Sequence, residues 1–163
     1  MINDASKQLS RYFAAGCRDR TPVTVGHMAH LLYMPVSFDS DVSSLCASVL
    51  SFNELQRSGR LKTGADKSHF NQRRAFRRYC GAAAIGSQKS LGDIDFSETE
   101  TGQPFLSGFP DLSFGFSSCQ NGFLGAWSST SSVGVDIESN TRQMDLVALA
   151  DQFFSATEAT LGY

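Results

Sequence analysis

Residues 133–158, VGVDIESNTRQMDLVALADQFFSATE, join a strand pattern to a helix pattern, and the rest of the chain is interpreted around them. The first six residues alternate between apolar and other residues, which is the period-2 pattern of a strand with two faces. Asp136 and Glu138 therefore project from one face, roughly 6–7 Å apart along the strand. Two carboxylates at that spacing repel each other unless a cation lies between them. Mg²⁺ typically takes one or two carboxylates together with substrate phosphates.

The second part of this stretch predicts helix. Apolar residues recur at helical spacing over 146–154. Ser155 is suited to an N-cap, and Glu158 stands three residues later, as in a capping box. A purely structural interpretation also fits, in which a surface strand carries two solvated acids and an ordinary capped helix follows.

The two motifs together resemble a known family. G-V-D-I-E followed by F-F-S-A-T-E is similar to the signature of the 4′-phosphopantetheinyl transferases, specifically the larger surfactin-type enzymes. Those enzymes move the phosphopantetheine arm of coenzyme A onto a serine of a carrier protein. The resemblance implies that Asp136 and Glu138 bind Mg²⁺ on the pyrophosphate. It also implies that Glu158 is the catalytic group that helps to deprotonate the incoming serine.

Composition is that of one globular domain. The chain has 163 residues, 41% of them hydrophobic, and a formal net charge of −2, so the whole molecule is not a general polyanion binder. The four cysteines form no C-x-x-C pair and no zinc spacing, and we expect reduced thiols in a cytoplasmic protein. No apolar run is long enough to span a membrane, so no membrane partner is expected.

The sequence before the arginine-rich region predicts a strand and two helix starts. Residues 23–36 are predicted to form a strand, and residues 41–49 a helix capped by Asp39 or Ser40. Residues 50–61, LSFNELQRSGRL, then resemble the family's L-S-x-x-E-x-x-R segment, which precedes its arginine-rich helix. A capping box formed by a serine and a glutamate is predicted at its start.

The arginine-rich helix is predicted from Asp66 onward. Arg73 and Arg77 are four residues apart, as are Arg74 and Arg78, so each pair shares a helix face. A solvated helix face explains part of this pattern. Four arginines in six residues, on a chain of net charge −2, favour an anionic ligand instead. Arginine matches phosphate geometry, so a nucleic-acid backbone and the phosphates of coenzyme A are both candidates.

The resemblance assigns these cations to coenzyme A. It implies that Arg74 and Arg78 contact its phosphates, with Arg78 the better match to the family's helix arginine. Arg60 and Lys62 match the family's contacts to the 3′-phosphate less closely.

Two further segments match the family with substitutions. Thr101-Gly102-Gln103-Pro104 is a predicted turn at the place of the family's G-K-P, so Gln103 and Pro104 are implied to lie at coenzyme A without the lysine charge. Residues 112–119 match a strand of the family that reads F-N-x-S-H-S. Ser117 is retained there, and Ser118 replaces a histidine that touches the pyrophosphate. Ser118 donates a hydrogen bond but carries no charge.

The predicted fold class is α+β, with the 4′-phosphopantetheinyl transferase fold. Residues 1–22 are predicted to be a polar, poorly ordered lead-in in which a short helix over 6–15 is possible. Residues 23–132 form the first half of the transferase. Residues 133–163 form the opening strand and helix of a second half, whose W-x-x-K-E-A helix is not in this sequence.

The predicted reaction is Mg²⁺-dependent transfer of the phosphopantetheine arm from coenzyme A to an acyl or peptidyl carrier protein. Two alternatives stay open. One is a non-catalytic homologue that binds coenzyme A or a carrier protein. The other is a nucleic-acid binder that uses the arginine-rich helix, which the net charge disfavours.

Overall fold

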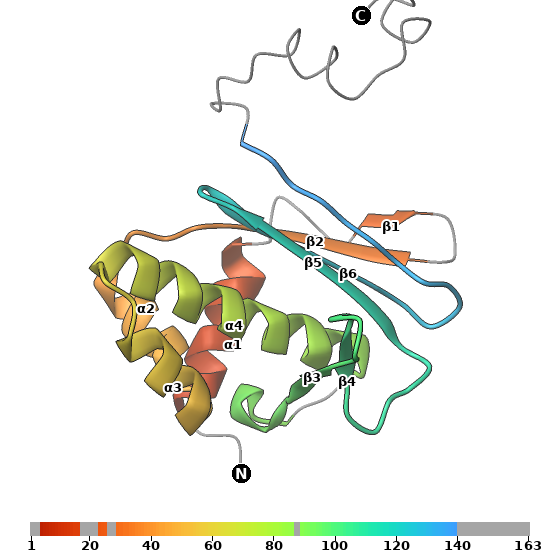
Figure 1. Cartoon of the computed structure of the whole chain (residues 1–163), viewed down its shortest axis with the longest axis horizontal. Helices are drawn as coiled ribbons and strands as arrows, with labels where there is room; N and C mark the ends of the chain where they lie inside the picture. The colour runs from red at the N-terminus through yellow and green to blue at the C-terminus, as the bar shows by residue number, and fades with distance from the viewer. Residues whose placement is uncertain (1–3, 17–22, 26–28, 87–88, 140–163) are drawn as a thin grey trace, which may run out of the picture.

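The computed structural model describes residues 4–16, 23–25, 29–86 and 89–139. Within them, four α-helices and two antiparallel sheets form an α+β arrangement, as the sequence predicts (Figure 1). The larger sheet has the strand order β1-β2-β6-β5, and all its pairs are antiparallel. Its strands are β1 (Val23–Val25), β2 (Ala29–Pro35), β5 (Ser113–Cys119) and β6 (Gly122–Ser128).

The 21-residue helix α4 (Gly64–Ala84) packs against this sheet and organises the core. Phe76 and Cys80 of α4 are buried against β6, where Phe76 meets the ring of Phe123. A Cβ atom on Gly125 of β6 would lie only 2.8 Å from the Cys80 sulfur. The absence of a side chain at Gly125 therefore sets how closely the helix approaches the sheet.

Helix α1 (Asp4–Gly16) belongs to the folded body. Leu9 and Phe13 on one of its faces are almost fully buried, and the Phe13 ring packs against those of Phe76 and Tyr79 of α4. The expectation of a poorly ordered lead-in is therefore wrong for residues 4–16. The short helix proposed over 6–15 is present and is longer than expected, because an apolar face in a mostly polar segment is enough to join a core.

Two predicted helix starts are confirmed. The helix α2 (Ser40–Ala47) begins after Asp39, whose side chain accepts a hydrogen bond from the backbone N–H of Asp41. Helix α3 (Phe52–Gly59) begins with the predicted capping box. In it, the Ser51 hydroxyl accepts from the Glu54 N–H at 3.3 Å, and a Glu54 oxygen accepts from the Ser51 N–H at 2.9 Å.

The prediction of a single strand over residues 23–36 is wrong, because two paired strands lie within this range. Val25 pairs with Ala29, so β1 and β2 run antiparallel. The smaller sheet is a hairpin. Its turn lies two residues before the predicted turn over 101–104, because the Gly102 N–H donates to the Thr99 carbonyl oxygen, and Gly102 has a φ of +81°. Its two strands are β3 (Phe96–Glu98) and β4 (Pro104–Leu106), and the short 3₁₀ helix η1 (Leu91–Asp93) precedes them.

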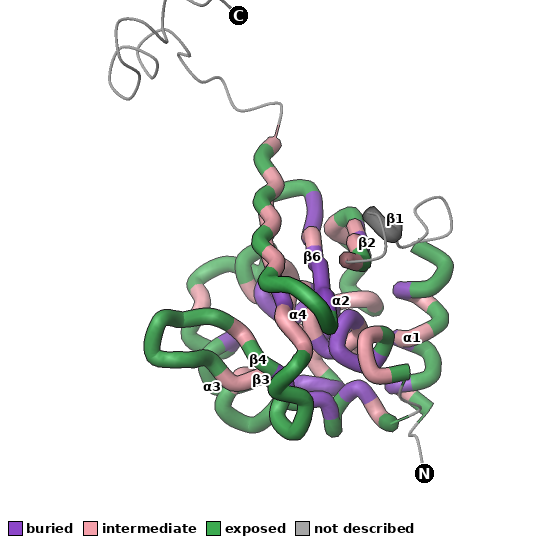
Figure 2. The backbone as a smooth tube through the Cα atoms, turned by 90° about the vertical axis from the view of Figure 1, so that its right-hand side faces the viewer, coloured by how far each residue is buried: buried purple, intermediate pink, exposed green. Residues whose placement is uncertain are grey.

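Residues 133–139 run along the side of the larger sheet that faces away from the helices (Figure 1). They are not assigned as a strand, but half-buried and exposed residues alternate along them as predicted (Figure 2). A Cβ on Gly115 of β5 would lie 3.2 Å from the Val133 carbonyl oxygen. The segment therefore lies directly over β5, and the predicted helix over 146–154 falls outside the described residues.

None of the helices in the described part of the chain is both long enough and apolar enough to cross a membrane. Cys46, Cys80 and Cys119 form no disulfide bond among the described residues, and burial raises the pKa of Cys46 to about 12.

Candidate functional site

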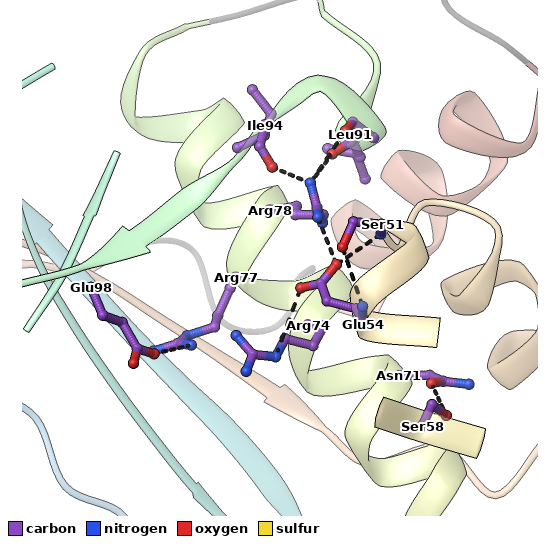
Figure 3. A network of polar contacts seen from close by, with 11 residues as sticks. Ser51, Glu54, Ser58, Asn71, Arg74, Arg77, Arg78, Leu91, Ile94 and Glu98 are labelled. Atoms are coloured by element: carbon purple, nitrogen blue, oxygen red, sulfur yellow. Dashed lines mark hydrogen bonds and ion pairs between the residues drawn. The ribbon is translucent and has the colours of Figure 1, made fainter. Parts of the chain in front are cut away.

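The arginines of α4 have different surroundings: Arg74 and Arg78 point toward Glu54, whereas Arg77 points toward Glu98 (Figure 3). Arg78 is only 4% exposed, and its Nη1 donates to the carbonyl oxygens of Leu91, Gly92 and Ile94 around η1. Its Nη2 donates to a Glu54 carboxylate oxygen at 2.7 Å. One guanidinium group thus joins α4 to η1 and to α3. This arrangement weighs against the predicted contact between Arg78 and coenzyme A.

Glu54 is the carboxylate of this interior cluster. Its second oxygen lies 3.8 Å from Nε of Arg74, which forms an ion pair at longer range. Burial alone would raise the pKa of Glu54, but hydrogen bonds from Arg78 and the Ser51 backbone, with the charges of Arg78 and Arg74, lower it overall. Glu54 therefore stays ionised at neutral pH and serves as both helix cap and counter-ion.

The face of α4 that points away from Glu54 borders a pocket. A pocket of about 410 Å³ lies between α4, β3 and the edge strand β5. Its lining contains the guanidinium groups of Arg57, Arg73, Arg74 and Arg77, and the carboxylate of Glu98. We call it the arginine pocket. Glu98 lies 3.7 Å from Arg77 and is more than half exposed, so it compensates only part of the positive charge.

Aromatic rings hold these cations in place. The Phe70 ring has the guanidinium carbons of Arg57, Arg73 and Arg74 at 6.0, 5.9 and 5.4 Å from its centroid. Arg77 lies over the Phe116 ring at 4.8 Å. Such contacts orient a guanidinium group without neutralising it.

The pKa values show that the positive charges are crowded. The pKa of Arg73 is lowered by burial and then by the charges of Arg74 and Arg57. The pKa of Arg77 is also lowered by burial first and by Arg74 second, with Glu98 opposing the shift. Burial and mutual repulsion therefore work against positive charge here, and a bound anion would offset the repulsion between the guanidinium groups.

Ser117 connects the arginine pocket to the predicted metal ligands. Ser117 and Ser118 both belong to the pocket lining. The Ser117 hydroxyl donates to a carboxylate oxygen of Asp136 at 2.8 Å and accepts from the Ile137 N–H at 3.2 Å. Asp136 is thereby fixed against β5, next to the arginine pocket but across the strand from α4.

The two carboxylates of residues 133–139 have the donor chemistry that Mg²⁺ prefers. Asp136 and Glu138 are both exposed and stand at alternate positions of the extended segment. Two carboxylates with open positions for phosphate and water suit a hard cation of this kind. Within the described residues, no group of three His, Cys, Asp or Glu side chains could hold a metal ion. Two carboxylates could hold a metal ion only together with ligands from elsewhere, such as substrate oxygens and water. The predicted base Glu158 lies outside the described part of the chain.

The remaining predicted contacts lie elsewhere. Gln103 and Pro104 line a different pocket of about 490 Å³, between the β3–β4 hairpin and the turn over 129–132. Arg60 and Lys62 are exposed on the connection between α3 and α4, outside the lining of the arginine pocket. Of the predicted coenzyme A contacts, the structure brings together Arg74, Ser117 and Ser118.

Three pocket arginines were not among the predicted site residues, namely Arg57, Arg73 and Arg77. The i,i+4 spacing in the sequence separates Arg73 and Arg77 from Arg74 and Arg78, but it does not say which pair turns inward. A scan against protein-family models finds no matching family, and a search of the curated proteins finds no match.

Proposed function

We propose that this protein transfers the 4′-phosphopantetheine arm of coenzyme A to a serine of a carrier protein, with Mg²⁺. The observation that carries the proposal is the meeting of the arginine pocket and Asp136 at Ser117 of β5. An arginine-lined pocket suits the 3′-phosphate and pyrophosphate of coenzyme A, and a carboxylate pair suits the metal that accompanies a pyrophosphate. The resemblance assigns phosphate contacts to Arg74, Ser117 and Ser118 and metal binding to Asp136, and the contacts among these residues support the proposal.

The residues of the site divide into phosphate ligands, metal ligands and a residue that positions a metal ligand. Arg73, Arg74 and Arg77 bind phosphate oxygens of the nucleotide, and the Ser118 hydroxyl supplies a neutral hydrogen bond. Asp136 and Glu138 hold Mg²⁺, which when bound neutralises negative charge on the pyrophosphate. The Ser117 hydroxyl keeps Asp136 in place.

The reaction is a phosphoryl-type transfer. The hydroxyl oxygen of the carrier serine forms a bond to the β-phosphorus of coenzyme A. The bond between that phosphorus and the bridging oxygen breaks, and 3′,5′-ADP leaves with the electron pair. Glu158 takes the proton of the serine hydroxyl as general base.

A specific observation favours one alternative, a homologue that binds coenzyme A without catalysis. The described residues supply two carboxylates for a metal but no third acidic ligand beside them. The arginine-helix nucleic-acid binder has less support, because Arg73, Arg74 and Arg77 are partly buried around a pocket and do not form an exposed stripe.

Intact-mass measurement of a carrier protein tests the proposal. The carrier is incubated with coenzyme A, Mg²⁺ and this protein, and a gain of one phosphopantetheine mass is expected. Asp136→Asn should abolish the gain, and EDTA should do the same. No gain in mass, despite calorimetric binding of coenzyme A, would support the non-catalytic homologue.

A further inference from the structure

A second and larger pocket adjoins the arginine pocket. It has a volume of about 840 Å³ and lies between the loop before α2, the first turns of α2 and α4, and the end of β5. Ser118 belongs to the lining of both pockets. The two pockets therefore meet at Ser118 of the edge strand, and we call the larger one the serine pocket.

The walls of the serine pocket are fixed by buried hydrogen bonds. Gln72 is 2% exposed, and its side chain both accepts from the Ser37 N–H at 2.8 Å and donates to the Ser37 carbonyl at 2.7 Å. It also donates to the Ser68 hydroxyl at 2.9 Å. On the other side, His69 Nε2 lies 3.0 Å from the Cys119 carbonyl oxygen and joins α4 to β5. The pocket is thus formed before any ligand enters.

Its chemistry differs from that of the arginine pocket. Hydroxyl groups line it at six serines, beside the apolar side chains of Val36, Phe38 and Ala65. Its fixed charges are the carboxylates of Asp39 and Asp66, which disfavour a phosphate. Hydroxyls and apolar groups suit an uncharged chain that carries amides and methyl groups.

We propose that the serine pocket binds the pantetheine arm of coenzyme A while the arginine pocket binds the nucleotide phosphates. The inference rests on the proposed function and adds a site for the uncharged half of the ligand. The pantetheine arm has two amides and a dimethyl-bearing carbon, and it leaves the pyrophosphate in the direction opposite to the adenosine. Ser118, at the junction of the two pockets, stands where the pyrophosphate joins both halves. The amides then hydrogen-bond to serine hydroxyls, and Phe38 covers the apolar part of the arm.

Calorimetry with coenzyme A and 3′,5′-ADP separates the two pockets, because the second ligand lacks the arm. Ser44 is exposed on α2 and lines the serine pocket, so Ser44→Trp fills the pocket without entering the core. Ser48→Trp is a matched control, since Ser48 is also exposed and lies outside the lining. Both hydroxyls donate to a backbone carbonyl near the same helix, so both substitutions remove a similar bond. Ala65→Trp blocks the pocket from the opposite wall if Ser44→Trp disturbs folding.

We expect Ser44→Trp and Ala65→Trp to weaken coenzyme A about tenfold or more and to leave 3′,5′-ADP unchanged. This factor is about 1.4 kcal/mol. Ser48→Trp should change neither affinity. Unchanged coenzyme A affinity in both pocket variants would overturn the arm assignment, and so would equal losses for both ligands. In either case 3′,5′-ADP binding by the unmodified protein would leave the proposed function standing. Absence of binding by both ligands would overturn the proposed function itself.

Discussion

Two arginine pairs on helix α4 have different partners and surroundings in this structure. Arg74 and Arg78 turn toward Glu54, and Arg78 is enclosed by carbonyl groups of η1. Arg73 and Arg77 line the arginine pocket, where the carboxylate in the lining belongs to Glu98, which is more than half exposed. The difference teaches that the partners of a cation, and not its spacing in the sequence, decide whether it is enclosed in the interior or lines an open pocket. Arg74 takes part in both settings, because it faces Glu54 and also lines the arginine pocket.

The largest expected effect is on stability, from Arg78→Met. The substitution keeps the volume of the side chain but leaves Glu54 without its nearest counter-ion and the η1 carbonyls without a donor. Breaking a buried ion pair from one side costs about 3–5 kcal/mol. Urea unfolding followed by circular dichroism measures the loss.

Arg73→Met is the matched control for that experiment. Burial and neighbouring charges lower the pKa of Arg73, so its positive charge works against folding at neutral pH. Its replacement should cost little stability or raise it. Equal losses for the two variants would show that the contrast between the pairs is wrong.

The next effect is on ligand affinity, and here we expect the pocket arginines to matter more than Arg78. Arg77→Met should weaken both coenzyme A and 3′,5′-ADP, because a hydrogen bond to a charged group is worth about 1.5–3 kcal/mol, or roughly tenfold and more in affinity. Pantetheine, which lacks these phosphates, should bind as before. Calorimetry on the folded variant measures all three ligands. A loss that is the same for pantetheine would place the phosphates elsewhere.

A smaller effect concerns pH and Glu54. Because the pKa of Glu54 is lower in the folded protein than its ordinary value of 4.5, the unfolded chain binds the proton more tightly. The ionised group therefore stabilises the fold at pH values above about 4.5, and this contribution disappears as the pH falls through the lower folded pKa. Glu54→Gln should cost about 1–2 kcal/mol at pH 7, since the amide keeps one hydrogen bond but loses the charge.

The unfolding free energies of the wild type and of Glu54→Gln should converge as the pH falls from 5 toward 3. Urea unfolding at a series of pH values measures this. Parallel curves over that range would mean that Glu54 is not the group whose ionisation supports Arg78.

Local signals in the sequence predicted the helices and caps well. The Ser51–Glu54 capping box depends on residues three apart, and Asp39 caps α2 through its own neighbour, so short-range chemistry settles both. The inward turn of Arg78 depends on Glu54 and Ile94, which are 24 and 16 residues away, and no local pattern contains that information. The hairpin of β1 and β2 was missed because both strands are apolar and together read as one strand.

The site was predictable to a similar degree. Asp136 and Glu138 alternate with apolar residues, and this period-2 pattern does place both on the exposed side of their segment. The family resemblance predicts Ser117 as a site residue, but its hydrogen bond to Asp136 spans 19 residues and depends on the tertiary structure. Arg57 enters the arginine pocket from α3, a different helix, so counting along α4 could not select it.

The smallest expected effect concerns Arg60 and Lys62, the predicted contacts to the 3′-phosphate. Both are exposed and lie outside the arginine pocket, so we expect them to act on a phosphate in that pocket through solvent and not by direct hydrogen bonds. Interactions of this kind are worth less than about 1 kcal/mol and are screened over about 10 Å at 0.1 M salt. The double variant Arg60→Ala/Lys62→Ala should therefore weaken 3′,5′-ADP about two- to threefold at low salt and not measurably at 0.5 M salt. Arg77→Met should retain most of its tenfold effect at the higher salt, because a partly buried contact is screened less. If the double variant instead loses tenfold at both salt concentrations, Arg60 and Lys62 touch the phosphate directly, and the ligand extends beyond the arginine pocket toward α3.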